Sequence, residues 1–119
     1  TYVEISINQQ HMWYYKNGKL VVETDVVTGN YGTNDTPKGA YSIIYKASPA
    51  TLMENSHVTF WLPFTSDGCG IHDASWRSSW EYGGTRYKGH GSHGCVNTPY
   101  NAAKKIYNNI SSGTRVVVY

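Results

Sequence analysis

The sequence predicts a mainly β fold: a β-sandwich or barrel with one helix docked near the C-terminus. Aromatic residues make up 14% of the 119 residues and charged residues only 15%, and Val, Ile and Thr are frequent, which favours strands. Short runs of alternating apolar residues recur between turn-forming residues. Only residues 99–110 have the apolar spacing of an amphipathic helix. The length suits one domain, covering residues 1–119, with one hydrophobic core.

The predicted strands are short and are bounded by Gly, Pro, Asn or Asp. In chain order they cover residues 2–7, 10–16, 19–28, 40–45, 58–64, 69–72 and 114–119. Asn17-Gly18 predicts a tight hairpin between the second and third strands, because both central residues of a type I′ turn need positive φ. Pro63 marks the end of the fifth strand, and Asp67-Gly68 leads into the sixth.

Three segments between the strands are predicted to be loops. Residues 29–39 are rich in Gly, Asn and Thr, and residues 47–57 are polar and irregular, which suggests a mobile lid. Residues 73–91 have no clear period but carry several aromatic side chains, as functional loops in small domains often do. For the helix, Thr98 is the expected N-cap, Pro99 the first helical residue and Gly113 the stop.

Charge and hydropathy exclude some classes of partner. A formal charge of +2 and a pI near 8.5, with Lys and Arg scattered, do not predict nucleic-acid binding. No apolar run approaches the roughly 20 residues of a membrane span, so no membrane contact by this domain is expected. Because a strand pattern starts at Tyr2, we expect a domain excised from a longer protein, which would carry any signal or anchor.

Two cysteines, Cys69 and Cys95, are too few for a disulfide framework. In an extended strand over 69–72, Cys69 shares a face with Ile71 and His72 takes the other face. If His72 faces Cys95, then Cys69 faces away. We therefore expect Cys69 to be a buried free thiol rather than a partner of Cys95.

The segment 92–97 reads SHGCVN and carries the strongest chemical signal. Cys95 follows a histidine and a glycine and precedes the predicted helix, so imidazole and helix dipole are both expected to lower the pKa of its thiol. Gly94 permits backbone angles that direct amide N–H groups toward a reacting carbonyl. These features together predict a cysteine nucleophile.

His72 is the preferred general base, because it ends a strand and precedes the loop that returns to Cys95. Asp73 can orient the imidazole through its carboxylate or its backbone carbonyl, and His93 is expected to shape the site. The candidate substrate-binding or oxyanion residues are Gly94, Ser92, Asn97, Trp76 and Tyr87. Of these, Ser92 and Asn97 are more typical of residues that hold a turn.

These residues resemble the signature of the L,D-transpeptidase (YkuD-type) catalytic domains. The resemblance is carried by SHGCVN at 92–97 with His72 upstream. It extends through residues 2–15, 36–39 and 70–73 and the terminal strand, and so covers nearly the whole chain. It implies a β-sandwich domain in which Cys95 is the nucleophile, His72 the base and the Asp73 carbonyl the orienting group. Amides around His93, Gly94 and Cys95 would form the oxyanion hole.

The resemblance also implies a bacterial cell-wall enzyme, located outside the cytoplasm, whose partners are donor and acceptor stem peptides of peptidoglycan. Such enzymes attack the L,D-bond between residues three and four of a tetrapeptide stem and release D-Ala. A side-chain amine of a second stem then resolves the thioester, and carbapenems acylate the same cysteine. No cofactor or metal is implied.

Three alternatives remain open at the level of sequence. His72, His93 and the two cysteines are possible zinc ligands, although their spacing fits no standard finger. A non-catalytic cell-wall-binding module would use the aromatic residues alone. An L,D-carboxypeptidase or other Cys–His peptidase would share the thiol chemistry and transfer the acyl group to water.

Overall fold

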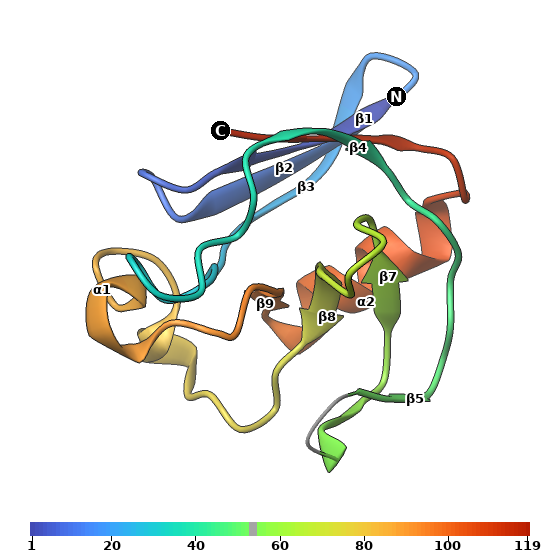
Figure 1. Ribbon diagram of the computed structural model, residues 1–119. Coiled ribbons are helices and arrows are strands. Elements are labelled where there is room, and N and C mark those ends of the chain that lie inside the picture. The colour runs from blue at the N-terminus through green and yellow to red at the C-terminus, as the bar shows by residue number, and fades with distance from the viewer. Residues whose placement is uncertain (53–54) are drawn as a thin grey trace.

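The computed structural model describes residues 1–52 and 55–119, and it confirms the mainly β fold with one longer helix near the C-terminus (Figure 1). The larger sheet has five strands; three of its four neighbouring pairs are antiparallel, and the pair β1 and β10 is parallel. In spatial order these strands are β3 (Lys19–Asp25), β2 (His11–Lys16), β1 (Tyr2–Ser6), β10 (Arg115–Val118) and β4 (Gly39–Ser42).

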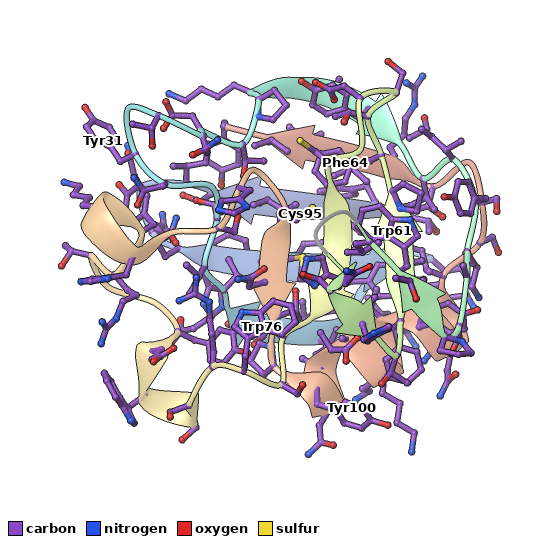
Figure 2. The ribbon with its side chains drawn as sticks, turned by 60° about the horizontal axis from the view of Figure 1, so that its bottom comes forward. Tyr31, Trp61, Phe64, Trp76, Cys95 and Tyr100 are labelled. Atoms are coloured by element: carbon purple, nitrogen blue, oxygen red, sulfur yellow. The ribbon has the colours of Figure 1, made fainter. Side chains whose placement is uncertain are left out.

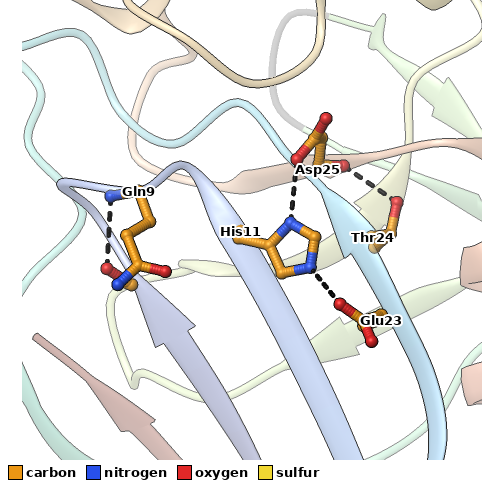
Figure 3. Close-up of polar contacts among 6 residues, drawn as sticks. Gln9, His11, Glu23, Thr24 and Asp25 are labelled. Atoms are coloured by element: carbon orange, nitrogen blue, oxygen red, sulfur yellow. Dashed lines mark hydrogen bonds and ion pairs between the residues drawn. The ribbon is translucent and has the colours of Figure 1, made fainter.

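The β2–β3 hairpin forms where the sequence predicts it. Asn17 and Gly18 have φ of 53° and 78°, the left-handed angles that its two-residue turn requires. At the other end of the hairpin, His11 Nδ1 lies 2.8 Å from Asp25 Oδ1 and His11 Nε2 lies 3.0 Å from Glu23 Oε1 (Figure 3). Both ring nitrogens face acceptors, so only the protonated ring can donate to both carboxylates at once.

A smaller sheet carries the segments with the predicted chemistry. It consists of β7 (Trp61–Pro63), β8 (Gly70–Asp73) and β9 (Val96–Thr98), with β8 antiparallel to β7 and parallel to β9. The strand predicted over 58–64 is divided in two: β6 (His57–Val58) pairs instead with β5 (Ala50–Thr51). This short hairpin lies in the predicted lid, of which residues 53 and 54 lie outside the described residues.

One core joins both sheets and the longer helix, α2 (Tyr100–Asn109). Its fully buried side chains come from β1, β2, β8, β9, α2 and β10, and include Val3, Ile5, Met12, Tyr14, Ile71, Val96, Ile106 and Val116. Burial of each such side chain contributes about 1.5–3 kcal/mol. Tyr14 OH also donates to Asn109 O at 3.0 Å, which holds the end of α2 against the larger sheet.

The predicted start of the helix is wrong by one residue. Thr98 belongs to β9 and pairs with Asp73, and its hydroxyl donates to Val96 O at 3.1 Å instead of capping the helix. Pro99 is the N-cap residue, and the helix begins at Tyr100. The loop 73–91 contains two short helices, η2 (Ser79–Glu81) and α1 (Tyr87–His90). Within the described residues, no helix has the length and apolarity to cross a membrane.

Candidate functional site

The smaller sheet brings the predicted residues onto one face. Its register aligns Trp61 with His72 and His72 with Asn97. Cys95 directly precedes β9, and it lines the same cavity as His72 and Asn97. Gly70, two residues before His72, leaves space on this face. A Cβ at Gly70 would lie 2.6 Å from Leu62 O and 2.7 Å from Pro63 Cα, so only glycine fits there.

An open cavity of about 810 Å³ covers this face. His72, His93 and Cys95 line it, as do Ser92, Asn97 and Trp76 among the other predicted residues. Figure 2 looks onto this face, with the side chains of Trp61 and Trp76 around Cys95. The lid hairpin contributes to the rim through Thr51, Leu52 and Ser56.

The His72 ring is held in one orientation. Its Nδ1 lies 2.6 Å from the backbone oxygen of Asp73, and a carbonyl only accepts, so Nδ1 carries the hydrogen and Nε2 is left as the acceptor. Trp61 and Trp76 flank the ring, with centroids 5.9 and 5.8 Å away. Burial lowers the pKa of His72, and the nearby charge of Arg77 acts in the same direction. The imidazole is therefore neutral at physiological pH.

The Asp73 carboxylate does not orient His72. It accepts backbone N–H bonds from Thr59 (2.9 and 3.1 Å) and from Phe60 (2.8 Å), and so fixes the chain that enters β7. Of the two ways in which Asp73 was expected to orient the imidazole, the geometry supports the backbone carbonyl.

Cys95 is a half-buried free thiol whose Sγ lies 3.5 Å from Gly68 O. Burial raises the pKa of Cys95 to about 11. A backbone hydrogen bond from Gly70 lowers this pKa, but its effect is smaller than that of burial. The expected lowering of the pKa of this thiol is therefore wrong for the resting protein. One reason is that β9 separates Cys95 from α2, so the residue does not lie at the helix N-terminus, where the dipole acts. Cys95 and His72 are thus both neutral.

The turn before Cys95 is tied together by Ser92, as predicted for that residue. Ser92 Oγ donates to Cys95 O and accepts from Gly94 N at 3.1 Å. Thr36 Oγ1 donates to Gly94 O at 2.7 Å, and Gly94 has φ of 124°, a left-handed angle that favours glycine. The Gly94 N–H donates to Ser92 Oγ and is therefore not free to bind an oxyanion. An oxyanion hole in this turn must use other backbone amides, and the N–H of Cys95 is the first candidate.

The predicted direction of Cys69 is wrong. Cys69 is free and half-buried, but it lines the same cavity as Cys95, and its Sγ lies 3.1 Å from the point that a Cβ at Gly94 would occupy. The pleat starts only at Gly70: Gly68 has φ of 100°, and Cys69 N donates to Thr65 Oγ1 within a turn. The alternation rule therefore does not apply to Cys69.

The remaining predicted residues separate into two groups. His93 is exposed and Trp76 is 53% exposed, and both line the cavity. Tyr87 is only 3% exposed, belongs to the hydrophobic core and does not line this cavity, so its predicted contact with substrate has no support. Its position at the start of α1 turns the ring inward.

Arg77 also lines the cavity, although no motif in the sequence points to it. It lies in the aperiodic loop 73–91, and only the fold brings it beside His72 and Asn97. The amide of Asn97 satisfies its neighbours when its oxygen is assigned to the side of Arg77, where it accepts from Nε at 2.8 Å and Nη2 at 3.3 Å. Across residues 1–52 and 55–119, no three His, Cys, Asp or Glu side chains form a group that could hold a metal ion.

The fold and this site define a class of protein: a small β domain in which a cysteine and an oriented histidine face one open cavity. The family model for the L,D-transpeptidase catalytic domain (YkuD) matches residues 1–118, and the chain belongs to this family. No match was found among curated proteins.

Solved structures support the same assignment. A variant of Enterococcus faecium L,D-transpeptidase with cysteine changed to serine is 42% identical, with a TM-score of 0.93, over 100% of this chain and 49% of that chain. The present chain thus spans about half the length of that protein. The E. faecium catalytic domain acylated by ertapenem is 40% identical, with a TM-score of 0.84, over 99% and 95% of the two chains. An L,D-transpeptidase from Mycobacterium smegmatis, 20% identical with a TM-score of 0.83 over 98% and 57%, shares the fold.

Proposed function

We propose that this chain is the catalytic domain of a peptidoglycan L,D-transpeptidase, with Cys95 as nucleophile and His72 as general base. The observation that carries the proposal is the oriented neutral imidazole of His72 in the same cavity as the half-buried thiol of Cys95. A general base needs a free acceptor nitrogen and a nearby proton donor. His72 Nε2 is such an acceptor, and the Cys95 thiol lines the same cavity.

In the proposed reaction, the Cys95 thiol gives its proton to His72 Nε2 as the sulfur attacks the carbonyl carbon of stem residue three. The tetrahedral intermediate collapses when the amine of D-Ala takes that proton from the imidazolium and leaves, which forms a thioester. An acceptor amine from a second stem then attacks the thioester, loses a proton to His72 and regenerates the thiol. The product is a 3-3 cross-link.

The raised pKa of Cys95 and the lowered pKa of His72 favour proton transfer during attack over a preformed ion pair. The electrophilic carbon of a substrate carbonyl that enters the cavity accepts the electron pair of the sulfur as the thiol loses its proton. We accordingly expect His72→Ala to slow acylation by roughly 10²–10⁴-fold, the usual contribution of a positioned base.

The same thiol chemistry extends to β-lactams. The E. faecium catalytic domain whose structure carries ertapenem is 40% identical to this chain. We propose that carbapenems acylate Cys95 in the same manner, and that the domain works outside the cytoplasm, where its proposed substrate lies. An L,D-carboxypeptidase reaction, with water as the acceptor, would use the same acylation step.

The test is intact-mass spectrometry with a carbapenem and with a purified disaccharide-tetrapeptide. One meropenem adduct on the wild-type protein and none on Cys95→Ala is the expected result, with Cys69→Ala as the matched thiol control that keeps the adduct. With tetrapeptide, a cross-linked dimer lacking one D-Ala indicates transpeptidation, and a free tripeptide indicates hydrolysis. A wild-type protein that forms no adduct, or Cys95→Ala that still forms one, would overturn the proposal.

A further inference from the structure

We propose that Arg77 binds the terminal carboxylate of the donor tetrapeptide and so makes the site selective for a free D-Ala carboxylate at stem position four. This inference rests on the proposed transpeptidase function and adds a specificity residue to it. Three features of Arg77 support this role: its buried charge, its unused hydrogen-bond donors and its position relative to His72.

The Arg77 guanidinium is mostly buried, and its ion pair with Glu81 is too long to be a hydrogen bond. Its side chain is only 9% exposed, and burial lowers its pKa. Nη2 donates to His90 O at 2.9 Å, and the Asn97 amide oxygen accepts from Nε and Nη2; both acceptors are neutral. Among the described residues, the one carboxylate within 4.0 Å is that of Glu81, at 3.7 Å from Nη1, beyond hydrogen-bond distance.

Buried cations in proteins are normally paired, because an unpaired buried charge loses its hydration without compensation. The two hydrogens of Nη1 are directed to no acceptor at hydrogen-bond distance among the described residues. Since Arg77 lines the open cavity, a ligand carboxylate can reach it. Guanidinium and carboxylate form charge-assisted bonds of matching planar geometry, which the neutral partners of Arg77 do not provide.

The position of Arg77 selects which carboxylate it meets. Asn97 aligns with His72 across β8 and β9, and it follows Cys95 by two residues. Arg77 contacts Asn97, and its charge acts on His72, so it stands on the His72 side of the nucleophile. The leaving amine must also be on that side, because it takes its proton from His72. In D-Ala a single carbon separates that amine from the carboxylate.

This arrangement distinguishes stems by length and charge. A tetrapeptide presents its carboxylate one carbon beyond the leaving amine, on the side of Cys95 that the proposal assigns to Arg77. A pentapeptide places an amide there and moves the carboxylate one residue, roughly 3.5 Å, further away. An amidated tetrapeptide has the right length but no charge, and so isolates the ion pair from the effects of size.

The experiment compares a tetrapeptide stem with its C-terminal D-alaninamide analogue. The rate of acyl-enzyme formation is followed by intact mass for wild type, Arg77→Gln and Arg77→Lys. Arg86→Gln is the matched control, because it removes an arginine from the same loop whose guanidinium lies over Trp80, outside the cavity. We expect the wild type and Arg86→Gln to prefer the free acid by roughly 10- to 100-fold in kcat/KM, as for a charge-assisted hydrogen bond. Arg77→Gln should lose this preference, and Arg77→Lys should keep part of it.

A second measurement separates this inference from the proposed reaction. In Cys95→Ala, which lacks the nucleophile, the dissociation constants of the acid and the amide are measured directly. Tighter binding of the acid that disappears in Cys95→Ala/Arg77→Gln supports the carboxylate site even if the wild type makes no acyl-enzyme. Equal binding and equal rates for acid and amide in the wild type would overturn the inference while acylation itself stands. Equal loss on both substrates in a folded Arg77→Gln would also overturn it.

Discussion

Cys95 and His72 are both held in their neutral forms by the same physical cause, the loss of hydration inside the fold. Desolvation disfavours whichever form is charged, so it raises the pKa of the thiol and lowers that of the imidazole. For a nucleophile and base that exchange a proton only during attack, this state keeps the thiol unreactive until a substrate carbonyl is present.

The rate of acylation by meropenem should fall at acid pH as His72 takes up a proton and can no longer act as the base. Because burial lowers the pKa of His72 below its usual 6.5, the midpoint of this loss should lie below pH 6.5. Stopped-flow or mass-based rates between pH 4.5 and about 8 would measure it. A midpoint above 6.5 would contradict a buried neutral imidazole.

Gly70→Ala should reduce both stability and acylation. The added methyl group would meet backbone atoms at 2.6 and 2.7 Å, so β7 and β8 must separate beside Cys95. Overpacking of this kind costs about 1–3 kcal/mol in the free energy of unfolding. Gly89→Ala is the matched control, since no atom lies within 4 Å of its Cβ position, and it should leave thermal stability and acylation unchanged.

At the scale of the element, β8 ends in a residue with two separate tasks. The Asp73 carbonyl orients His72, while its carboxylate anchors the amides of Thr59 and Phe60. A strand end can serve both because the backbone and the side chain point in different directions.

Asp73→Asn should therefore lower stability without disorienting the base. An amide offers one acceptor where the carboxylate offered two, and charge-assisted bonds are lost, at a cost of about 1–3 kcal/mol. Since the charge of Asp73 raises the pKa of His72, its removal should move the acid midpoint of acylation slightly further down. Urea denaturation and the pH–rate profile together test this; an unchanged midpoint would show that the carboxylate does not act on His72, and an upward shift would contradict the sign of its effect.

Elements with local signals were predictable from the sequence, and those fixed by distant partners were not. The Asn17-Gly18 turn needs only its own backbone angles, and it forms as predicted. Thr98 has the residue type of an N-cap, but pairing with β8 extends the strand through it. The sequence pattern put Cys69 in the strand that contains His72, but this strand begins one residue later, at Gly70. The motif predicted that His72 and Cys95 lie in one site, and both line the cavity. Arg77 reaches this cavity only because of the path of the whole loop 73–91.

At the scale of the whole molecule, burial of His72 links folding to pH. The pKa of His72 is lower in the folded chain than its unfolded value of 6.5, so the unfolded chain binds more protons between these two values. This contribution to stability is fully present above pH 6.5 and is lost as pH falls toward the folded pKa. The denaturation midpoint of the wild type should fall between pH 7 and pH 5 more than that of His72→Gln. Equal pH dependence in the two proteins would contradict this linkage.

The place of β10 in the larger sheet has a consequence for biosynthesis. This strand, the last in chain order among the described strands, lies between β1 and β4 rather than at an edge (Figure 1). Until it arrives, β1 and β4 have no ladder to each other and two rows of unpaired backbone groups stay open to water and to other chains. The larger sheet of the nascent domain therefore cannot form completely until β10 has been synthesised. A chain truncated before Arg115 is expected to be captured by chaperones or proteases.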